Sequence, residues 1–367
     1  MWQKPYGKTG KKISVIGFGA MRFANPENIN ANAEVVLHAY ERGINYFDTA
    51  PEYCKDKSEE IVGAALRQMK PGTFYVSTKC MAAKGDELRA SIEQSLNRLR
   101  VDCIHFFHIW CLLKPGDLDA RIAGGAVAAA LKAKDEGLIE HLVTSSHLAG
   151  RELKRVLERG LFEGVTLGYS AINFPYREEA VKAAASLGLG LVTMNPLGGG
   201  LIPANAERFA FLRGRKDPSV VAAALRFNVS HPAVTSALVG FTTKAHVDQA
   251  VEAVEGFKPY DRARIARMRE RILDSFEGLC TGCGYCLPCP EGVEIPKMMD
   301  AYNMRLLEGS DPKHVVNRLK WHWGIEAADA KACALCGECE DRCTQHLPIG
   351  ERLKEIAGLA EAKPPKT

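Results

Sequence analysis

The stretch Gly43-Ile44-Asn45-Tyr46-Phe47-Asp48-Thr49-Ala50-Pro51-Glu52-Tyr53 is followed closely by an amphipathic segment over Ser58–Met69. Its short apolar run predicts a buried β-strand that ends at Asp48, and the longer amphipathic segment predicts a helix. Units of this kind recur between residues 11 and 258. A chain that alternates strands and helices in this order favours a parallel sheet.

Eight strand–helix units fit this region, and they predict a closed (β/α)8 barrel. An open doubly wound sheet is the alternative α/β arrangement, but the run Gly17–Arg22 after the first strand lacks the third glycine of a dinucleotide-binding turn. The opening Tyr6–Lys12 predicts a small hairpin that plugs the bottom of the barrel. The expected strands are Ser14–Phe18, Ile44–Asp48, Phe74–Thr78, Cys103–Ile109, Leu138–Thr144, Gly164–Tyr169, Gly190–Met194 and Ser236–Val239. The expected helices are Asn32–Arg42, Ser58–Met69, Lys84–Leu99, Gly124–Glu136, Ala149–Glu158, Arg177–Leu187, Ser219–Ser230 and Lys244–Val254.

The twelve cysteines are distributed unevenly along the 367 residues. Four lie in the first 279 residues, and the other eight lie between residues 280 and 343. This shift in composition predicts two domains, a barrel over residues 1–258 and a small, mainly α-helical, ferredoxin-like domain over residues 259–367. In the second domain, Ile295–Leu307 and His314–Trp323 have the pattern of short helices.

The late cysteines form two arrays, Cys280-x2-Cys283-x2-Cys286-x2-Cys289-Pro290 and Cys333-x2-Cys336-x2-Cys339-x3-Cys343. Three cysteines at successive two-residue gaps wrap the backbone around one cubane, and the fourth points away from it. In bacterial two-cluster ferredoxins that fourth cysteine binds the other cluster. We therefore expect two [4Fe-4S] clusters, one held by Cys280, Cys283, Cys286 and Cys343 and the other by Cys333, Cys336, Cys339 and Cys289.

Zinc and disulfides are the alternative uses of these cysteines. Structural zinc sites use cysteine pairs separated by a longer loop, so two triplets would leave a thiolate unused at each zinc. Disulfides are uncommon where thiols stay reduced. The arrays depart from the ferredoxin run in two places, since the first closes with a two-residue gap and Thr344 follows the second where proline is usual. Eight cluster ligands fit these departures better than an accidental pattern does.

Polar side chains follow three consecutive strands of the expected barrel. Asp48 and Tyr53 follow the second strand, Lys79 follows the third, and His105 and His108 lie on the fourth. Because chemistry in such barrels takes place where strands end, we expect these groups to converge at one mouth. A nearby ammonium lowers the pKa of a tyrosine, so Tyr53 would give a proton to a carbonyl oxygen as hydride reaches the carbon. An Asp–Lys pair taken alone is more often a structural ion pair.

The runs Tyr6–Gly10, Ile16–Arg22, Gly43–Tyr53 and Pro196–Leu201 resemble the aldo-keto reductases. With its two cysteine arrays, the chain is similar over nearly its whole length to the branch of that family that is fused to a ferredoxin. The resemblance implies a (β/α)8 barrel that moves hydride between NAD(P)H and aldehydes or ketones. It therefore implies a small carbonyl or alcohol substrate, with catalytic roles for Asp48, Tyr53 and Lys79.

The fourth catalytic position of the family, a histidine, falls at Trp110 in this chain. His108 lies two residues earlier on the same strand face, so it would reach the same pocket. We expect His108 to orient the substrate. The alternatives are that Trp110 shapes the pocket without a histidine, and that His105 and His108 are hydrogen-bonded core residues.

The resemblance also implies a nucleotide site. Ser145, Ser146 and His147 would meet the nicotinamide carboxamide, and Met194 stands where an aromatic ring commonly stacks on nicotinamide. His246 stands where the family's arginine pairs the 2′-phosphate, so NADP and NAD are both open. The residues expected to bind the cofactor are Arg22, Ser145, Ser146, Met194, Pro196, Leu197, Gly198, Gly199, Gly240, Thr242, Thr243 and Lys244, of which the last four open a helix that can take phosphate.

Composition argues against two classes of function. The net charge of +4 is mild and no dense Lys/Arg tract occurs, so we expect no nucleic-acid partner. The sequence has no uninterrupted apolar run of ~18 residues and no apolar core of a signal peptide near Met1, so we expect no membrane span and a cytoplasmic location.

Hydride carries two electrons, whereas each cluster accepts one. Our leading expectation is an NAD(P)H-linked carbonyl oxidoreductase with an attached electron-transfer module, which would serve an electron-transfer protein. One alternative is an electron-transfer protein whose barrel holds a flavin, with its phosphate in the loops after strands seven and eight, or docks a partner enzyme. Another is a redox sensor that binds a cofactor without turnover.

Overall fold

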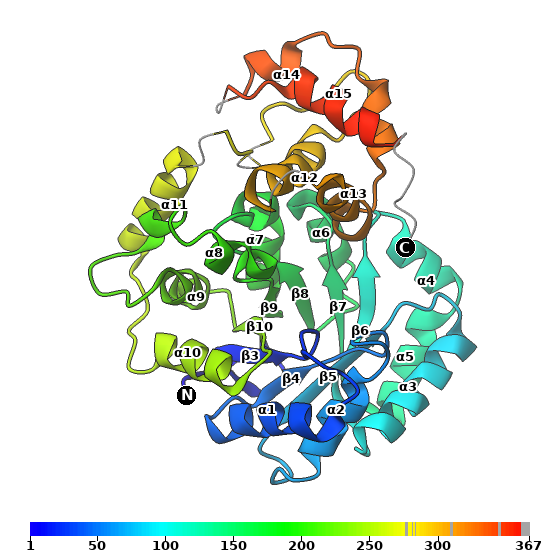
Figure 1. Ribbon diagram of the computed structural model, residues 1–367. Coiled ribbons are helices and arrows are strands. Elements are labelled where there is room, and N and C mark those ends of the chain that lie inside the picture. The colour runs from blue at the N-terminus through cyan, green and yellow to red at the C-terminus, as the bar shows by residue number, and fades with distance from the viewer. Residues whose placement is uncertain (276–277, 281, 283, 309–310, 344–345, 361–367) are drawn as a thin grey trace. The chain divides into compact units, whose positions relative to one another are not determined.

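The structure is a computed structural model that describes residues 1–275, 278–280, 282, 284–308, 311–343 and 346–360. Its described residues include a closed barrel of eight parallel strands in the order β10-β3-β4-β5-β6-β7-β8-β9 (Figure 1). The expected (β/α)8 barrel is confirmed, and the open sheet is excluded because β10 pairs with β3. The strands are β3 (Ile16–Gly19), β4 (Tyr46–Asp48), β5 (Tyr75–Cys80), β6 (Ile104–Leu112), β7 (Ile139–Ser146), β8 (Gly164–Gly168), β9 (Gly190–Met194) and β10 (Ser236–Gly240).

The N-terminal hairpin closes the barrel at the end where the strands begin. Strands β1 (Gln3–Pro5) and β2 (Lys12–Ser14) pair antiparallel, and the fully buried Tyr6 packs in a cluster with Tyr46 and Phe106. A Cβ atom at Gly190, the first residue of β9, would lie 2.1 Å from a Tyr6 ring carbon. The position of the Tyr6 ring therefore requires a glycine at residue 190. Because the hairpin fills one end of the barrel, a functional site is expected at the opposite end.

Helices cover the outside of the barrel (Figure 1). The Asn28 side chain accepts a hydrogen bond from the Ala31 N–H at 3.1 Å, and Ser219 and Thr243 cap α9 and α10 in the same way. The short helix α4 was not predicted, and Gly125 (φ 87°) separates it from α5. The helices of this unit are α1 (Ile29–Glu41), α2 (Ser58–Leu66), α3 (Gly85–Leu99), α4 (Asp117–Ala123), α5 (Ala126–Asp135), α6 (Gly150–Leu157), α7 (Glu178–Leu187), α8 (Leu201–Ala204), α9 (Val220–Ser230) and α10 (Lys244–Val254), with 3-10 turns η2 (Gly198–Gly200) and η3 (Ala210–Leu212).

Strand β6 runs beyond its predicted end at Ile109 and reaches Leu112. Its pairing with β7 shifts register between Ile109 and Leu112, and Cys111 takes a φ of 61°. An irregularity of this kind redirects the side chains around it. Trp110 lies within the irregular stretch, at the carboxyl end of the strand.

The chain divides into two compact units, of which the second comprises Ile172–Tyr176 and residues 267–367. Its core contains Met298, Leu319 and Ile356, and cysteines of both arrays pack against that core. The predicted helix at Ile295–Leu307 is confirmed, whereas the predicted His314–Trp323 helix is divided between α13 and a π-helical turn. The elements are η1 (Phe174–Arg177), α11 (Arg262–Ser275), which begins in the first unit, α12 (Ile295–Glu308), α13 (Pro312–Asn317), η4 (Arg318–Trp323), η5 (Ala327–Ala332), α14 (Glu338–Asp341) and α15 (Ile349–Leu359).

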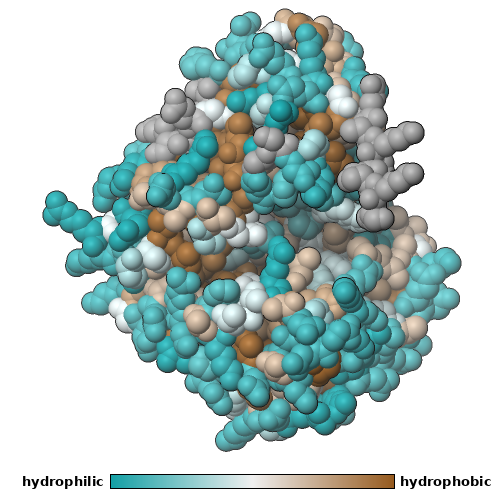
Figure 2. Space-filling view, in the orientation of Figure 1, coloured by the Kyte–Doolittle hydropathy of each residue, from teal (hydrophilic) through white to brown (hydrophobic). Residues whose placement is uncertain are grey.

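The face of the molecule in Figure 2 is mainly hydrophilic, with hydrophobic residues gathered in patches. Within the described ranges, no helix has the length and apolar character needed to cross a membrane.

Candidate active site and cysteine arrays

A buried ion pair lies at the carboxyl ends of β4 and β5. Lys79 Nζ donates a hydrogen bond to Asp48 Oδ1 at 2.5 Å, and each side chain is 3% exposed. Ser77 Oγ donates to the other carboxylate oxygen of Asp48 at 2.8 Å. Burial lowers the pKa of Lys79, and the charge of Asp48 opposes that shift. The two strand ends therefore hold a charge pair that little water can reach.

Tyr53 lies beside this pair in the turn after β4. The Lys79 ammonium lies 5.4 Å from the centroid of the Tyr53 ring. The pKa of Tyr53 is raised well above its usual value, first by burial and then by the charge of Asp48. This direction is opposite to the lowering expected from Lys79 alone, because Asp48 offsets the lysine charge and burial disfavours a phenolate. Tyr53 thus keeps its proton at neutral pH, as a proton donor must.

The turn after Tyr53 has an unusual backbone. Three consecutive residues without a glycine, Cys54, Lys55 and Asp56, take φ values of 55°, 54° and 67°. This left-handed conformation costs free energy for residues that carry a Cβ atom. Arg98 of α3 stabilises it, since its guanidinium donates to both carboxylate oxygens of Asp56 at 2.8 and 2.7 Å.

His108 lies inside the barrel below the mouth. Its side chain is fully buried, its Nε2 lies 2.9 Å from Ser77 Oγ, and the same nitrogen lies 3.8 Å from Asp48 Oδ2. Because the Ser77 hydroxyl donates to Asp48, the contact with His108 needs a proton on Nε2. Burial first, and then the Lys79 charge, lower the pKa of His108 well below 6.5. His108 is therefore a neutral group that supports Asp48 through Ser77.

Trp110 lies one layer nearer the mouth than His108 on the same face of β6. Its ring meets the Tyr53 ring edge-on, with centroids 5.6 Å apart and an interplanar angle of 84°. Arg121 Nη2 donates to the Trp110 carbonyl oxygen at 2.9 Å. The structure therefore puts Trp110, and not His108, beside the phenol. His105 faces away, since its Nδ1 accepts from the Val76 N–H at 3.2 Å.

Ser77 joins Asp48 and His108, and no role was predicted for it from the sequence. It stands two residues before Lys79 on β5, so the two-residue period of a strand puts both side chains on one face. That spacing was the feature of the sequence that pointed to Ser77.

The expected nucleotide residues lie at the carboxyl ends of β7, β9 and β10 and in the segments that follow. Ser145 Oγ accepts from the Cys111 N–H at 3.2 Å, and Ser146 Oγ donates to the Leu112 carbonyl at 3.0 Å. Both hydroxyls therefore also anchor the irregular end of β6. Met194 is the last residue of β9, and Pro196 and Leu197 continue from it towards η2.

The turn η2 fits a close approach of phosphate. Gly198, Gly199 and Gly200 have φ values of 66°, 72° and 107°, and a Cβ atom at Gly199 or Gly200 would meet nothing within 4 Å. Glycine leaves the backbone of such a turn open to a ligand.

The start of α10 brings the remaining expected residues together. Thr242 Oγ1 donates to the Arg22 carbonyl at 3.0 Å, and a Cβ atom at Gly240 would lie 2.7 Å from Arg22 Cγ. Thr243 caps the helix through the His246 N–H, and Lys244 pairs with Glu34 at 3.1 Å. Arg22, Gly240 and Thr242 therefore form one group in the structure.

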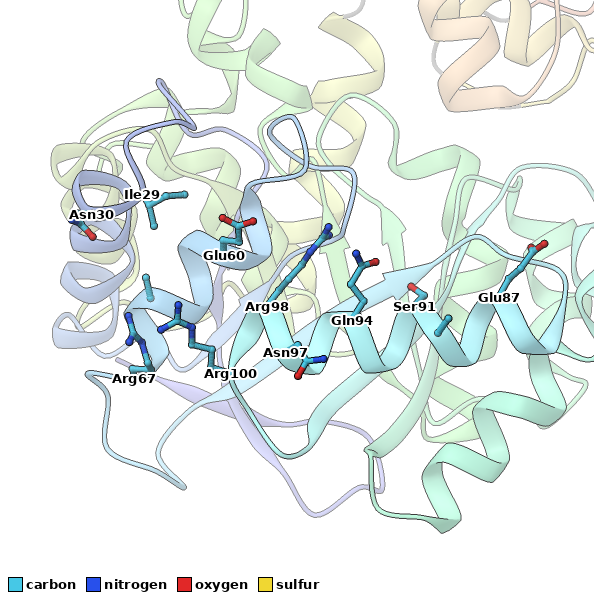
Figure 3. A pocket seen from close by; sticks show the side chains of 12 residues that line it. Ile29, Asn30, Glu60, Arg67, Glu87, Ser91, Gln94, Asn97, Arg98 and Arg100 are labelled. Carbon is cyan, nitrogen blue, oxygen red and sulfur yellow. The ribbon is translucent and has the colours of Figure 1, made fainter.

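A larger hollow of about 1060 Å³ lies elsewhere, among the outer helices α1, α2 and α3. Figure 3 shows Glu60, Arg98 and Gln94 along it. None of the expected catalytic residues lines this hollow, so we do not assign the chemistry to it.

The two cysteine arrays share a local geometry. The Gly282 N–H donates to Cys280 Sγ at 3.4 Å, and the Leu335 N–H donates to Cys333 Sγ at the same distance. Gly282 and Leu335 take φ values of 69° and 57°. Left-handed turns that aim N–H groups at cysteine sulfur fit a cluster, because its sulfurs accept such hydrogen bonds.

Cysteines of the two arrays also lie near each other. Cys286, Cys289, Cys333, Cys336 and Cys339 line one cavity of about 200 Å³. Burial lowers the pKa of Arg352, and the charges of Tyr302, Cys280 and Cys343 oppose that shift. Cys283 lies outside the described residues. Among the described residues, no three His, Cys, Asp or Glu side chains are grouped closely enough for a single metal ion.

Two family models match this chain, one over the barrel and one over the region of the cysteine arrays. Residues 15–272 match the family model of the aldo/keto reductase family. The chain belongs to the aldo/keto reductase family. Residues 279–348 of this aldo/keto reductase match the model of a 4Fe-4S dicluster domain. The expected fused architecture is confirmed, and the protein is an oxidoreductase with an iron–sulfur domain.

Individual relatives of this aldo/keto reductase match two thirds to three quarters of the chain. L-galactose dehydrogenase of Arabidopsis thaliana is 28% identical over 279 residues, which are 68% of this chain and 86% of the relative. D-threo-aldose 1-dehydrogenase of a Pseudomonas species is 25% identical over 297 residues, with 66% and 90% covered. The holo form of a Bacillus halodurans aldo-keto reductase superposes with a TM-score of 0.64 at 22% identity, over 75% of this chain and 96% of that one. That likeness shows the fold alone.

Proposed function

We propose that this aldo/keto reductase reduces an aldehyde or ketone, or oxidises the corresponding alcohol, with Tyr53 as the group that gives or takes the proton. The observation that carries the proposal is the buried Lys79–Asp48 pair at 2.5 Å, with its ammonium beside the Tyr53 ring. A bound NAD(P)H would supply the hydride. L-galactose and aldose dehydrogenases among the relatives support a hydroxyl or carbonyl carbon of a sugar-like molecule as the reacting centre.

Each residue of the site has its own role in the proposed reaction. Tyr53 donates its proton to the carbonyl oxygen as negative charge develops there, which is general acid catalysis. The Lys79 ammonium stabilises the phenolate that remains, and Asp48 keeps Lys79 charged inside the barrel. Ser77 and His108 hold Asp48 in place. Trp110 forms the wall beside Tyr53 where the family has a histidine, so we assign substrate contact to Trp110 rather than to His108.

The nucleotide would lie along the strand ends that follow Tyr53 around the barrel. In this proposal Ser145 and Ser146 contact the carboxamide, Met194 contacts the nicotinamide face, and the η2 glycines contact the pyrophosphate. The start of α10 would take the phosphate of the adenosine half. His246 stands where the family has an arginine for the 2′-phosphate, and imidazole lacks the bidentate fork of a guanidinium, so the proposal favours neither NADP nor NAD.

The eight late cysteines hold two [4Fe-4S] clusters in this proposal. Their support is the matching family model, the shared turns at Gly282 and Leu335, and the cavity lined by both arrays. The clusters would pass single electrons to or from a partner protein.

The decisive experiment is on anaerobically purified protein. Iron, acid-labile sulfide and flavin are measured first, and reduction of a panel of aldehydes and sugar-derived carbonyls by NADH and NADPH follows. The proposal expects about eight irons per chain and a rate that Tyr53→Phe lowers at least ~100-fold. Reduction at the wild-type rate by Tyr53→Phe would refute the assigned chemistry.

One observation supports a second candidate function. Trp110 replaces the histidine that orients carbonyl substrates in the family, and one-electron clusters exchange electrons with a flavin more readily than with hydride. An electron-transfer protein with flavin in the barrel would contain flavin after purification, and its clusters would be reduced by a ferredoxin without NAD(P)H.

A further inference from the structure

A short segment of the chain lies in the cluster-binding unit although its neighbours in sequence do not. Residues Ile172–Tyr176 follow β8 and precede α7, both of which belong to the first unit, yet the segment itself belongs to the second. Its last residue, Tyr176, lies in the turn η1 and is 7% exposed.

The Tyr176 side chain contacts the first cysteine array directly. Its hydroxyl oxygen lies 3.3 Å from Cys280 Sγ and 3.3 Å from the Pro296 carbonyl oxygen. Its ring lies against Gly282, where a Cβ atom would come within 2.3 Å of a ring carbon. The ring also meets Trp323, with centroids 5.5 Å apart. The phenol therefore has a defined position rather than a loose one.

Cys280 is held equally firmly on its backbone side. Its N–H donates to Asn303 Oδ1 at 2.9 Å, and Asn303 Nδ2 donates back to the Cys280 carbonyl at 2.9 Å. Asn303 belongs to α12 and is 1% exposed. This clamp, together with the packing around Tyr176, keeps the hydroxyl and the sulfur within hydrogen-bond distance.

The direction of the hydrogen bond follows from the proton count. A cysteine bound to a cluster is a thiolate and has no proton to give, and the Pro296 carbonyl is an acceptor only. Of the hydroxyl oxygen, the sulfur and the carbonyl oxygen, only the hydroxyl oxygen carries a proton. The phenol must therefore donate, either to the sulfur or to a site shared with the carbonyl.

We propose that Tyr176 is a positioning residue that donates a hydrogen bond to the Cys280 thiolate and thereby raises the reduction potential of the cluster held by the first array. Reduction adds negative charge that spreads onto the ligand sulfurs, so a donor at a sulfur stabilises the reduced state more than the oxidised one. The inference rests on the proposed cluster ligation by Cys280.

The two arrays differ in this respect. Cys280 Sγ accepts from the Gly282 N–H and from the Tyr176 phenol. Cys333 Sγ, at the equivalent place in the second array, accepts from the Leu335 N–H, and no side-chain donor to it is present in the described part of the chain. Removal of the Tyr176 hydroxyl should therefore change the reduction potential of one cluster and leave the potential of the other nearly unchanged.

The test is an electron paramagnetic resonance titration of both clusters in full-length, anaerobically purified protein. Tyr176→Phe keeps the ring against Gly282 and removes only the hydroxyl. The expected result is a more negative potential for one cluster and an unchanged potential for the other. Tyr302→Phe is the matched control, because Tyr302 belongs to the same unit and its hydroxyl donates to the Glu355 carboxylate at 2.9 Å instead of to a cysteine sulfur. Its potentials should equal those of the wild type.

A second measurement does not depend on the folding of Tyr176→Phe. A Tyr285→Phe variant, which removes the exposed tyrosine inside the first array, is prepared with ring-deuterated tyrosine and should show a deuterium coupling to one reduced cluster in electron–nuclear double resonance. No coupling, or potentials that are equal in wild type and Tyr176→Phe at full iron content, would overturn the inference. Iron far below about eight atoms per chain in the wild type would instead refute the cluster proposal on which it rests.

Discussion

Lys79 Nζ lies 2.5 Å from Asp48 Oδ1, and both side chains are almost completely removed from water. Two strands that are neighbours in the barrel bring these residues together from positions 31 residues apart in the sequence. Within the described residues, neither Lys79 nor Asp48 has a second oppositely charged partner at that distance. The pair therefore stabilises the folded barrel mouth and also holds the ammonium that the proposed reaction uses.

Asp48→Asn should destabilise the protein and abolish carbonyl reduction. The substitution leaves a buried ammonium without its partner, which costs about 3–5 kcal/mol of the free energy of unfolding. Chemical denaturation measures that loss. Glu60→Gln is the control, because the exposed Lys57–Glu60 pair at 3.5 Å should contribute no more than about 1 kcal/mol. Equal losses in the two variants would contradict a special role for the buried pair.

Substitutions at Trp110 and His108 should separate substrate contact from support of Asp48. Trp110→Ala removes the ring at 5.6 Å from Tyr53, so KM should rise roughly 10-fold, equivalent to ~1.4 kcal/mol of binding. His108→Leu should lower kcat and stability with little change in KM, since His108 is fully buried. Steady-state kinetics with one aldehyde shows which of the two residues contacts the substrate. A KM effect confined to His108→Leu would restore His108 as the residue that orients substrate.

We expect the fourth cysteine of each array to bind the cluster of the other array. Substitution of either fourth cysteine should therefore remove the cluster held mainly by the opposite array. Cys343→Ser should remove the resonance signal of the cluster bound to Cys280, and Cys289→Ser should remove the signal of the other. Each variant should lose roughly half of the iron. Cys54→Ser, which alters a cysteine outside both arrays, should keep all of it. Loss of the same signal in both variants would show that each array holds its own fourth ligand.

Gly190→Ala should weaken the barrel through the Tyr6 ring. A new Cβ atom 2.1 Å from a ring carbon forces either the ring or the strand to move, which costs at least about 1–3 kcal/mol. The double variant Tyr6→Ala/Gly190→Ala should show strong non-additivity, because the clash is then gone. Gly358→Ala in α15 is the control, since nothing lies within 4 Å of its Cβ position. Additive losses would mean that the hairpin does not plug the barrel.

The ion pairs of Glu163 predict that the free energy of unfolding decreases as the pH falls into the acid range. Burial tends to raise the pKa of Glu163, but hydrogen bonds from His141 and Lys134 prevail and lower it from 4.5 to about 2. A depressed pKa in the folded state gives stability that is present above pH 4.5 and is lost as the pH falls towards 2. Glu163→Gln should therefore flatten the decline in unfolding free energy across this window. An unchanged slope in the variant would assign the acid sensitivity to other carboxylates.

Local chemistry made much of the fold and part of the site predictable. The alternation of strand and helix patterns depends on neighbours within a few residues, so the barrel and its eight strands could be anticipated from the sequence. The cysteine spacing is equally local, because one turn of backbone fixes which thiolates face a common centre. Asp48, Tyr53 and Lys79 could be placed at the mouth because each stands where a strand ends.

The tertiary structure alone decided which side chain lies beside Tyr53 and how burial shifts its pKa. Trp110 and His108 share a strand face, and only the packed barrel shows that Trp110 meets the phenol while His108 lies beneath it on Ser77. The contact between Tyr176 and Cys280 joins residues 104 positions apart. Such contacts, and the loss of water around a charge, depend on how whole elements pack, and no spacing within the sequence encodes them directly.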